Sequence, residues 1–162
     1  MITRHTLLLS CIACASLALA GCAAKSGGSS APAASAASSS MQVYTATLTP
    51  AEEVPPAADS KGTGTAELRV DSRTNEMTWK VSYSGLTGPA TAGHVHGPAA
   101  KGANAGVVIP FTTLTPGATS AEGKGTMTQA QYGDLAAGLY YVNIHTAKYP
   151  GGEVRGQLMR KP

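Results

Sequence analysis

The amino-acid sequence predicts an all-β protein, an antiparallel β-sandwich of about seven or eight strands with at most one short helix. Apolar and polar residues alternate with a period of two through most of residues 42–162, which is the pattern of strands that bury one face. Glycine- and proline-rich segments separate these runs at close spacing, and no helical repeat alternates with them as the crossovers of a parallel sheet would require.

The expected strands follow one another along the domain. The first three alternate over residues 43–48, 65–70 and 77–83. Only residues 128–138, TQAQYGDLAAG, have the composition of a short helix, with Thr128 as the N-cap. The remaining strands are expected within GHVHGPA (93–99), GVVIPF (106–111), GKGTMT (123–128), LYYVNIHTA (139–147) and EVRGQLM (153–159).

The start of the chain has the features of a secretory signal: a basic beginning, an apolar run over residues 7–20 and small residues before Cys22. The tetrapeptide LAGC, residues 19–22, also resembles the bacterial lipobox, in which a signal peptidase cuts before a cysteine that carries a diacylglyceryl group. We therefore expect residues 1–21 to be removed and Cys22 to be lipidated, with plain secretion as the alternative. Ala23 stands where lipoproteins retained in the inner membrane usually carry aspartate. This favours a lipid-anchored protein of the bacterial cell envelope, on the outer membrane and facing the periplasm or the cell surface.

Residues 22–41 are almost entirely Ala, Ser and Gly. Such a segment has too little apolar surface to offset the entropy lost on ordering, so we expect a flexible tether between the lipid and a single domain over residues 42–162.

The cysteines and the charge balance exclude several functions. Cys11 and Cys14 lie in the segment expected to be removed, and Cys22 would carry the lipid, so neither a disulfide nor a catalytic thiolate is expected. Residues 42–162 contain 10 of the 12 Lys and Arg and all 9 Asp and Glu, a net charge of about +1 with no basic run. We therefore expect no nucleic-acid partner; the expected partners are the membrane, a metal ion and an unidentified protein.

Three histidines remain in the domain: His94, His96 and His145. Residues two apart on a strand share a face, so His94 and His96 point the same way while Val95 points into the core. In YYVNIH the apolar set places His145 on the non-core face as well. Three neutral imidazoles without a thiolate suit Cu(II), Zn(II) or Ni(II), and the Irving–Williams order favours copper over zinc. We predict a metal site of these three histidines, with a role in ordering surface loops as the alternative.

The neighbours of this site follow from the expected hairpin of residues 139–147 and 153–159. A five-residue loop, KYPGG, would place His145 opposite Arg155 and Asn143 opposite Gln157. A guanidinium beside His145 would disfavour the imidazolium, which is the direction that a metal ligand needs. The competing roles for Arg155 are to attract an anion to the site or to form a surface salt bridge with Glu153. Asn143, Arg155 and Glu153 are therefore the residues expected around the metal ligands.

Five segments resemble successive motifs of the CHRD domain, a module found in the animal protein chordin and in bacterial secreted proteins. The resemblance covers residues 42–160 and implies an extracytoplasmic module. A weaker resemblance, in the order and facing of His94, His96 and His145, is to the copper-zinc superoxide dismutases. Together they imply an immunoglobulin-like or dismutase-like sandwich. The CHRD motifs are AEEVPP (51–56), GTGTAEL (62–68), AGHVHGPA (92–99), GVV (106–108) and YVNIHTAKYPGGEVRGQL (141–158).

Three functions are open on this evidence. The leading one is a non-enzymatic, membrane-anchored domain that binds copper, or else zinc, for sequestration or delivery. The second is a metal-free module whose histidines order the GPAAKGANAG and KYPGG loops around a protein or glycan partner. The third is a copper redox enzyme of dismutase-like geometry, which the lack of a bridging histidine, a zinc loop and a cysteine pair disfavours.

Overall fold

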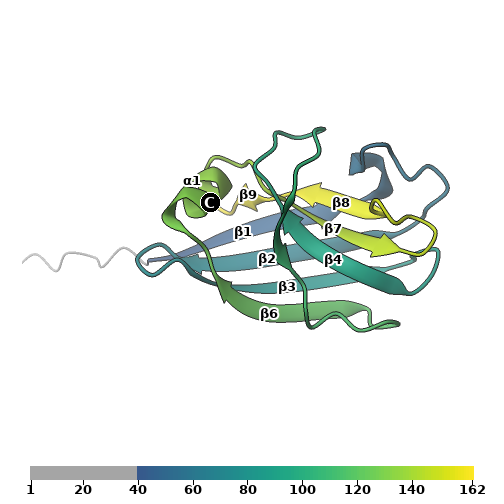
Figure 1. Ribbon diagram of the computed structural model, residues 1–162, viewed down its shortest axis with the longest axis horizontal. Helices are drawn as coiled ribbons and strands as arrows, with labels where there is room; N and C mark the ends of the chain where they lie inside the picture. Colours follow the sequence, from purple (N-terminus) through teal and green to yellow (C-terminus); the bar gives the residue numbers. More distant parts are fainter. Residues whose placement is uncertain (1–39) are drawn as a thin grey trace, which may run out of the picture. The chain divides into compact units, whose positions relative to one another are not determined.

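The computed structural model describes residues 40–162. The expected signal segment, the lipidated Cys22 and the tether up to residue 39 lie outside the described residues. The described part is built almost entirely of strands, with one short helix, as predicted (Figure 1). Its elements are β1 (Met41–Leu48), η1 (Pro50–Glu52), β2 (Thr63–Asp71), β3 (Glu76–Ser84), β4 (Ala90–His96), β5 (Val107–Pro110), β6 (Ser120–Thr126), α1 (Gln129–Ala136), β7 (Tyr141–Thr146), β8 (Val154–Gln157) and β9 (Met159–Arg160).

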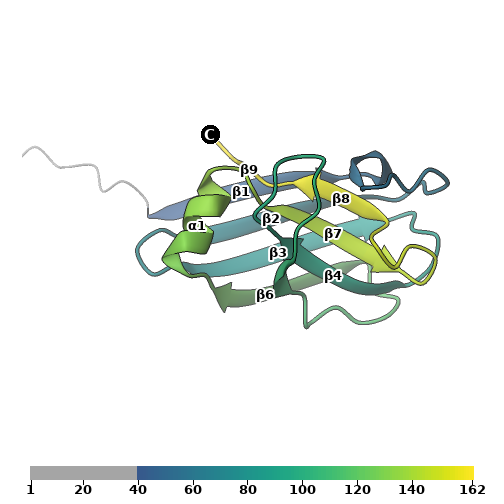
Figure 2. The same ribbon diagram turned by 45° about the horizontal axis from the view of Figure 1, so that its top comes forward.

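The strands form two antiparallel sheets that pack face to face. One sheet has the order β6-β3-β2-β1-β9 and the other the order β5-β4-β7-β8. Figures 1 and 2 show β4, β7 and β8 lying as a second layer over β1, β2 and β3. The predicted antiparallel sandwich is therefore confirmed.

The C-terminal run was expected to be one strand, but it divides between the two sheets. β8 pairs with β7 in the four-stranded sheet, whereas β9 pairs with β1 in the five-stranded sheet. Leu158 stands at the crossing, fully buried, and its N–H donates to the Tyr140 carbonyl oxygen. Because a fully buried leucine anchors the crossing, the chain changes sheets without leaving the core.

The short helix α1 begins where the sequence places its cap. The Thr128 hydroxyl accepts from the N–H of Gln131 at 3.2 Å, and the Gln131 side chain accepts from the N–H of Thr128 at 2.8 Å. This reciprocal pair satisfies two backbone donors that the first turn would leave free. Within residues 40–162, no helix combines the length and the apolar character that crossing a membrane requires.

The two sheets bury their faces differently. β2 and β3 alternate between buried and exposed positions, so the outer face of the five-stranded sheet is open to solvent. β7 is buried at all six positions, so both faces of the four-stranded sheet are covered at its centre. The outer face of the four-stranded sheet is also the face on which the histidines were expected.

The hairpin of β7 and β8 has a different register from the predicted one. Asn143 lies opposite Arg155 and Tyr141 opposite Gln157, a shift of two residues. The predicted loop was too short, because Thr146 joins the turn: its hydroxyl accepts from the Tyr149 N–H at 3.2 Å and donates to Glu153 at 2.6 Å. A shift of two residues leaves every side chain on its predicted face, since the side-chain period of a strand is two.

The core around Trp79 has a glycine-dependent contact. The Trp79 ring stacks on Phe111 with ring centroids 5.6 Å apart. On the neighbouring strand β6, a Cβ atom at Gly123 would overlap the Trp79 ring, whereas one at Gly125 would meet it at an ordinary 3.6 Å. Gly123 is therefore needed for the packing of the single tryptophan.

We predict that Gly123→Ala lowers the free energy of unfolding by about 1–3 kcal/mol, because the methyl group overpacks the core against Trp79. Gly125→Ala, on the same strand, is the matched control and should change it by less than about 1 kcal/mol. Urea unfolding followed by tryptophan fluorescence measures both. Equal destabilisation by the two variants would contradict the proposed contact.

Candidate metal centre

The outer face of the four-stranded sheet brings the three histidines together from two adjacent strands. In the β4–β7 register, His94 lies opposite Asn143 and Ala92 opposite His145, so His145 is the diagonal neighbour of His94. Val95 is fully buried in the core, as predicted, which turns both flanking imidazoles outward. The three histidines offer ligand atoms that all lie within 4.8 Å of one another.

The distances between these nitrogens are close to those between nitrogens bound to one metal ion. Nδ1 of His94 lies 2.9 Å from Nε2 of His145. Two nitrogens bound at about 2.1 Å to one tetrahedral ion are roughly 3.4 Å apart. A separation of 4.8 Å must shorten by about 1.4 Å to reach this value, a displacement that side-chain rotation of two rings can share. These residues could therefore hold a metal ion.

Backbone carbonyls fix the orientation of two of the rings. Nδ1–H of His145 donates to the Pro150 carbonyl oxygen at 2.9 Å, and Nδ1 of His96 lies 3.0 Å from the Ala105 carbonyl oxygen. A carbonyl oxygen only accepts, so the neutral ring of His145 carries its proton on Nδ1 and presents the lone pair of Nε2. Nε2 of His96 also faces an acceptor, Oδ1 of Asn143 at 3.0 Å, so the neutral His96 ring donates to one of its two oxygen neighbours at a time. Metal-binding histidines are commonly oriented by such a bond.

The third histidine completes the cluster through His145. With Nε2 of His145 as an acceptor, the short contact is made by Nδ1–H of His94 donating to it. A metal ion bound to both nitrogens would replace this single proton. Of the three rings, that of His94 is only half-buried, whereas His96 and His145 are each 8% exposed.

The surroundings keep all three imidazoles neutral at pH 7. Burial, and then the nearby charges of His145 and His96, lower the pKa of His94 to about 4. Burial also lowers the pKa of His96 and of His145, although the hydrogen bonds to Ala105 and Pro150 act in the opposite direction. Neutral imidazole is the form that binds metals.

Arg155 lies next to the cluster. The sequence analysis predicted that it would lie opposite His145, but it does not contact that residue. Its guanidinium stands 3.4 Å from the ring centroid of Tyr141, and the Tyr141 ring stacks on His96 at 4.9 Å and 4°. Because β7 lies between β4 and β8, Tyr141 separates Arg155 from the histidines. The predicted pairing of Arg155 with His145 is therefore wrong.

Arg155 instead fastens the loop of residues 97–106 over the sheet. It is only 2% exposed and donates to the Ala103 carbonyl oxygen at 2.6 Å and to Oδ1 of Asn104 at 2.9 Å. The Tyr141 hydroxyl accepts from the N–H of Ala105 at 3.1 Å. The same loop supplies the Ala105 carbonyl that orients His96, so Arg155 acts on the cluster through the loop.

The other two predicted neighbours have different places. Oδ1 of Asn143 lies 3.0 Å from Nε2 of His96, so Asn143 borders the cluster. Glu153 lies outside the cluster. Its carboxylate accepts from the Thr146 hydroxyl, and Thr146 points to the opposite face of β7 from His145. The Glu153 carboxylate also accepts from Ser60 and from both the N–H and the hydroxyl of Thr87. The net pKa of Glu153 is lowered, because the raising effect of burial is outweighed by these four hydrogen bonds to the carboxylate.

A buried carboxyl group that the sequence did not mark as unusual lies beside Arg155. Glu53 is 4% exposed, its carboxyl group packs against Gly152, and its Oε1 has no hydrogen-bond partner among the described residues. Burial raises the pKa of Glu53 to about 7, against the lowering effects of the Arg155 charge and the Val54 N–H. Nothing in AEEVPP distinguishes it from Glu52, which pairs with Lys101 at 2.9 Å.

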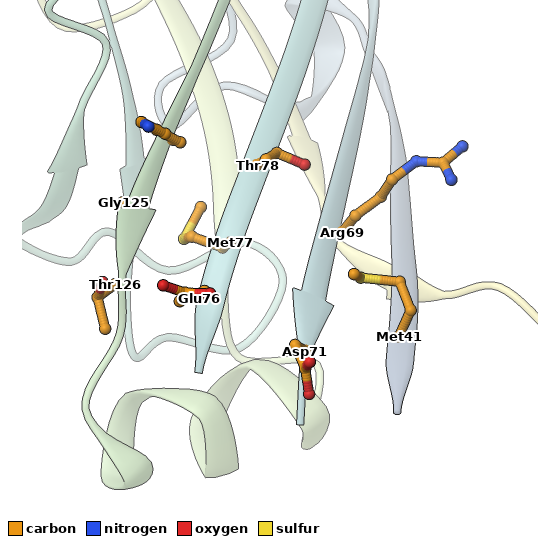
Figure 3. Close-up of a pocket in the computed structure, with 9 residues that line it drawn as sticks. Met41, Arg69, Asp71, Glu76, Met77, Thr78, Gly125 and Thr126 are labelled. Atoms are coloured by element: carbon orange, nitrogen blue, oxygen red, sulfur yellow. The ribbon is translucent and has the colours of Figure 1, made fainter. Parts of the chain in front are cut away.

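The outer face of the five-stranded sheet is also hollowed, near Met41, Arg69 and Asp71 (Figure 3). The labelled side chains there point in different directions rather than toward one another. Arg69 is paired with Glu67 at 2.8 Å, and Asp71 accepts from the N–H of Arg73 at 2.9 Å. The hollow therefore lacks the convergence of donor atoms that the histidine cluster has.

The fold and the cluster define a class: an all-β sandwich domain with a candidate transition-metal centre on the outer face of one sheet. The family model described as the CHRD domain matches residues 44–158. The chain therefore belongs to the CHRD domain family, which confirms the resemblance seen in its motifs. The match includes the three histidines, Asn143 and Arg155. No curated protein and no solved structure matches the chain.

We predict that Glu53 makes stability depend on pH. Its folded pKa of about 7 exceeds its ordinary value of 4.5, so its contribution is intact below pH 4.5 and is lost as the pH rises to 7. The loss amounts to about 3 kcal/mol. Glu53→Gln should therefore unfold at higher denaturant concentration than the native protein at about pH 8 and at a similar one near pH 4.5.

Chemical unfolding at both pH values measures this difference, and Glu52→Gln is the matched control. Glu52 is paired at the surface, so its substitution should change stability by no more than about 1 kcal/mol at either pH. The three histidines titrate alike in all the proteins and cancel in the comparison. A Glu53→Gln effect of the same size at both pH values would refute the assignment.

Proposed function

We propose that this CHRD domain binds one transition-metal ion, copper in preference to zinc, through His94, His96 and His145, and holds it for sequestration or delivery. The observation that carries the proposal is the 2.9 Å separation of Nδ1 of His94 from Nε2 of His145, with the third histidine in reach. Two of the three rings are already oriented by backbone carbonyls, so binding needs little reorganisation.

The preference for copper rests on the donor set. The cluster offers three imidazoles and, among the described residues, neither a thiolate nor a carboxylate. Imidazole donors bind Cu(II) more tightly than Zn(II) in the Irving–Williams order. The half-buried His94 gives the ion a route from solvent.

The location of the domain is part of the same proposal. The tetrapeptide that ends in Cys22, after the apolar run over residues 7–20, supports lipidation and a membrane anchor. Ala23 supports sorting to the outer membrane, with the domain facing the periplasm or the cell surface. A lipid-anchored metal-binding domain would retain copper in the cell envelope.

Calorimetric titration of the protein with Cu(II) and with Zn(II) tests the proposal. We expect one ion per chain and tighter binding of Cu(II). His94→Ala and His145→Ala should each weaken binding by at least about 100-fold, because losing a ligand costs more than losing a residue that orients one. Thr91→Ala, at an exposed position of β4, is the matched control and should bind as the native protein does.

Equal binding by the native protein and both histidine variants would place the metal elsewhere and overturn the proposal, as would the absence of binding. Tryptophan fluorescence in parallel shows that each variant is folded, because Trp79 is buried on the other sheet.

A second candidate function is a metal-free interaction module whose histidines order its loops. The observation in its favour is that His96 and His145 lie at hydrogen-bond distance from carbonyl groups of the 97–106 and 147–152 loops, at Ala105 and Pro150. Hydrogen exchange of the metal-free protein, measured before and after Cu(II) is added, separates the two functions. In a loop-ordering role, His145→Ala would speed exchange in the 147–152 loop while added Cu(II) would leave the native protein unchanged.

A further inference from the structure

The histidine cluster contains no negative charge. Its three ligands are neutral imidazoles, and Asn143, which lies 3.0 Å from Nε2 of His96, is a neutral amide. Glu153 is directed to the opposite face of β7, where Ser60, Thr87 and Thr146 satisfy its carboxylate. Among the described residues, the cluster therefore offers a metal ion no anionic partner.

The nearest fixed charge is positive. Arg155 lies 3.4 Å from the centroid of the Tyr141 ring, on which His96 is stacked. A carboxyl group beside this guanidinium, that of Glu53, packs against Gly152 in the neighbouring loop. A divalent ion at the histidines would thus add two positive charges to a face that already has one.

A dication in partly buried surroundings is costly without a counter-charge. Three protein ligands also leave one position of a tetrahedral ion open. An anion in that position would complete the coordination and offset the charge at once. The half-buried His94 marks the side from which a small anion can approach.

We propose that a divalent ion held by His94, His96 and His145 takes a small inorganic anion as its fourth ligand, so that the loaded domain is an anion receptor. This inference rests on the proposed function, because the three histidines must first bind the metal. It adds a class of ligand that the metal site alone does not specify.

Azide is a suitable probe, because its binding to Cu(II) produces a charge-transfer absorption band. The full chain loaded with one equivalent of Cu(II) is titrated with sodium azide at constant ionic strength, and sodium perchlorate serves as the control salt. We expect a saturable band with a dissociation constant in the millimolar range or below. Perchlorate should leave the spectrum unchanged.

Two substitutions that add a carboxylate test whether the lack of negative charge at the cluster is what recruits the anion. Asn143→Asp is isosteric and places a negative charge beside His96. Ala92→Asp places one at a half-buried position opposite His145, and it keeps the test available if the first variant does not fold. Either variant should bind azide at least about tenfold more weakly than the native protein. Ala92→Ser is the uncharged control and should retain azide binding.

The outcomes separate the two proposals. If one Cu(II) binds but azide leaves the spectrum unchanged, the anion proposal fails while the metal site stands. It also fails if both aspartate variants bind azide as tightly as the native protein, because charge is then not what recruits the anion. If no Cu(II) binds, the proposed function itself fails.

Discussion

The buried guanidinium of Arg155 is the contact on which the histidine face depends. A charge that is 2% exposed is stable only with partners, and Arg155 finds them in the Tyr141 ring, the Ala103 carbonyl and Asn104. The last two belong to the loop that covers the outer face of β7. Satisfying this one side chain therefore fixes the loop, and the loop in turn orients His96 through Ala105.

The period of two along the strands allowed the facing of the candidate site to be predicted. Val95 is in the core and the three histidines are on the outer face, and His145 kept its face even though its hairpin register was wrong by two residues. The cover of this face was not predictable in the same way. It depends on carbonyl groups of Ala103, Ala105 and Pro150, and every residue type has such a group.

The different pKa shifts of the two buried glutamates could not be predicted from the sequence. Glu153 accepts four hydrogen bonds and its pKa is lowered, whereas Oε1 of Glu53 has no partner among the described residues and its pKa is raised to about 7. Both lie within or beside loops rich in glycine and proline. The difference comes from Ser60, Thr87 and Thr146, which the fold brings to Glu153 alone.

The crossing at Leu158 joins the two sheets along one side of the sandwich. β9 pairs with β1, and Thr49 exchanges backbone hydrogen bonds with Arg155, so the two sheets are joined along this side. The opposite edges are β5 and β6, which have no strand beyond them in the described part of the chain. Local opening breaks the fewest backbone bonds at those edges. Since β5 borders the strand that carries His94, an ion or a ligand would exchange at the edge where local opening breaks the fewest backbone hydrogen bonds.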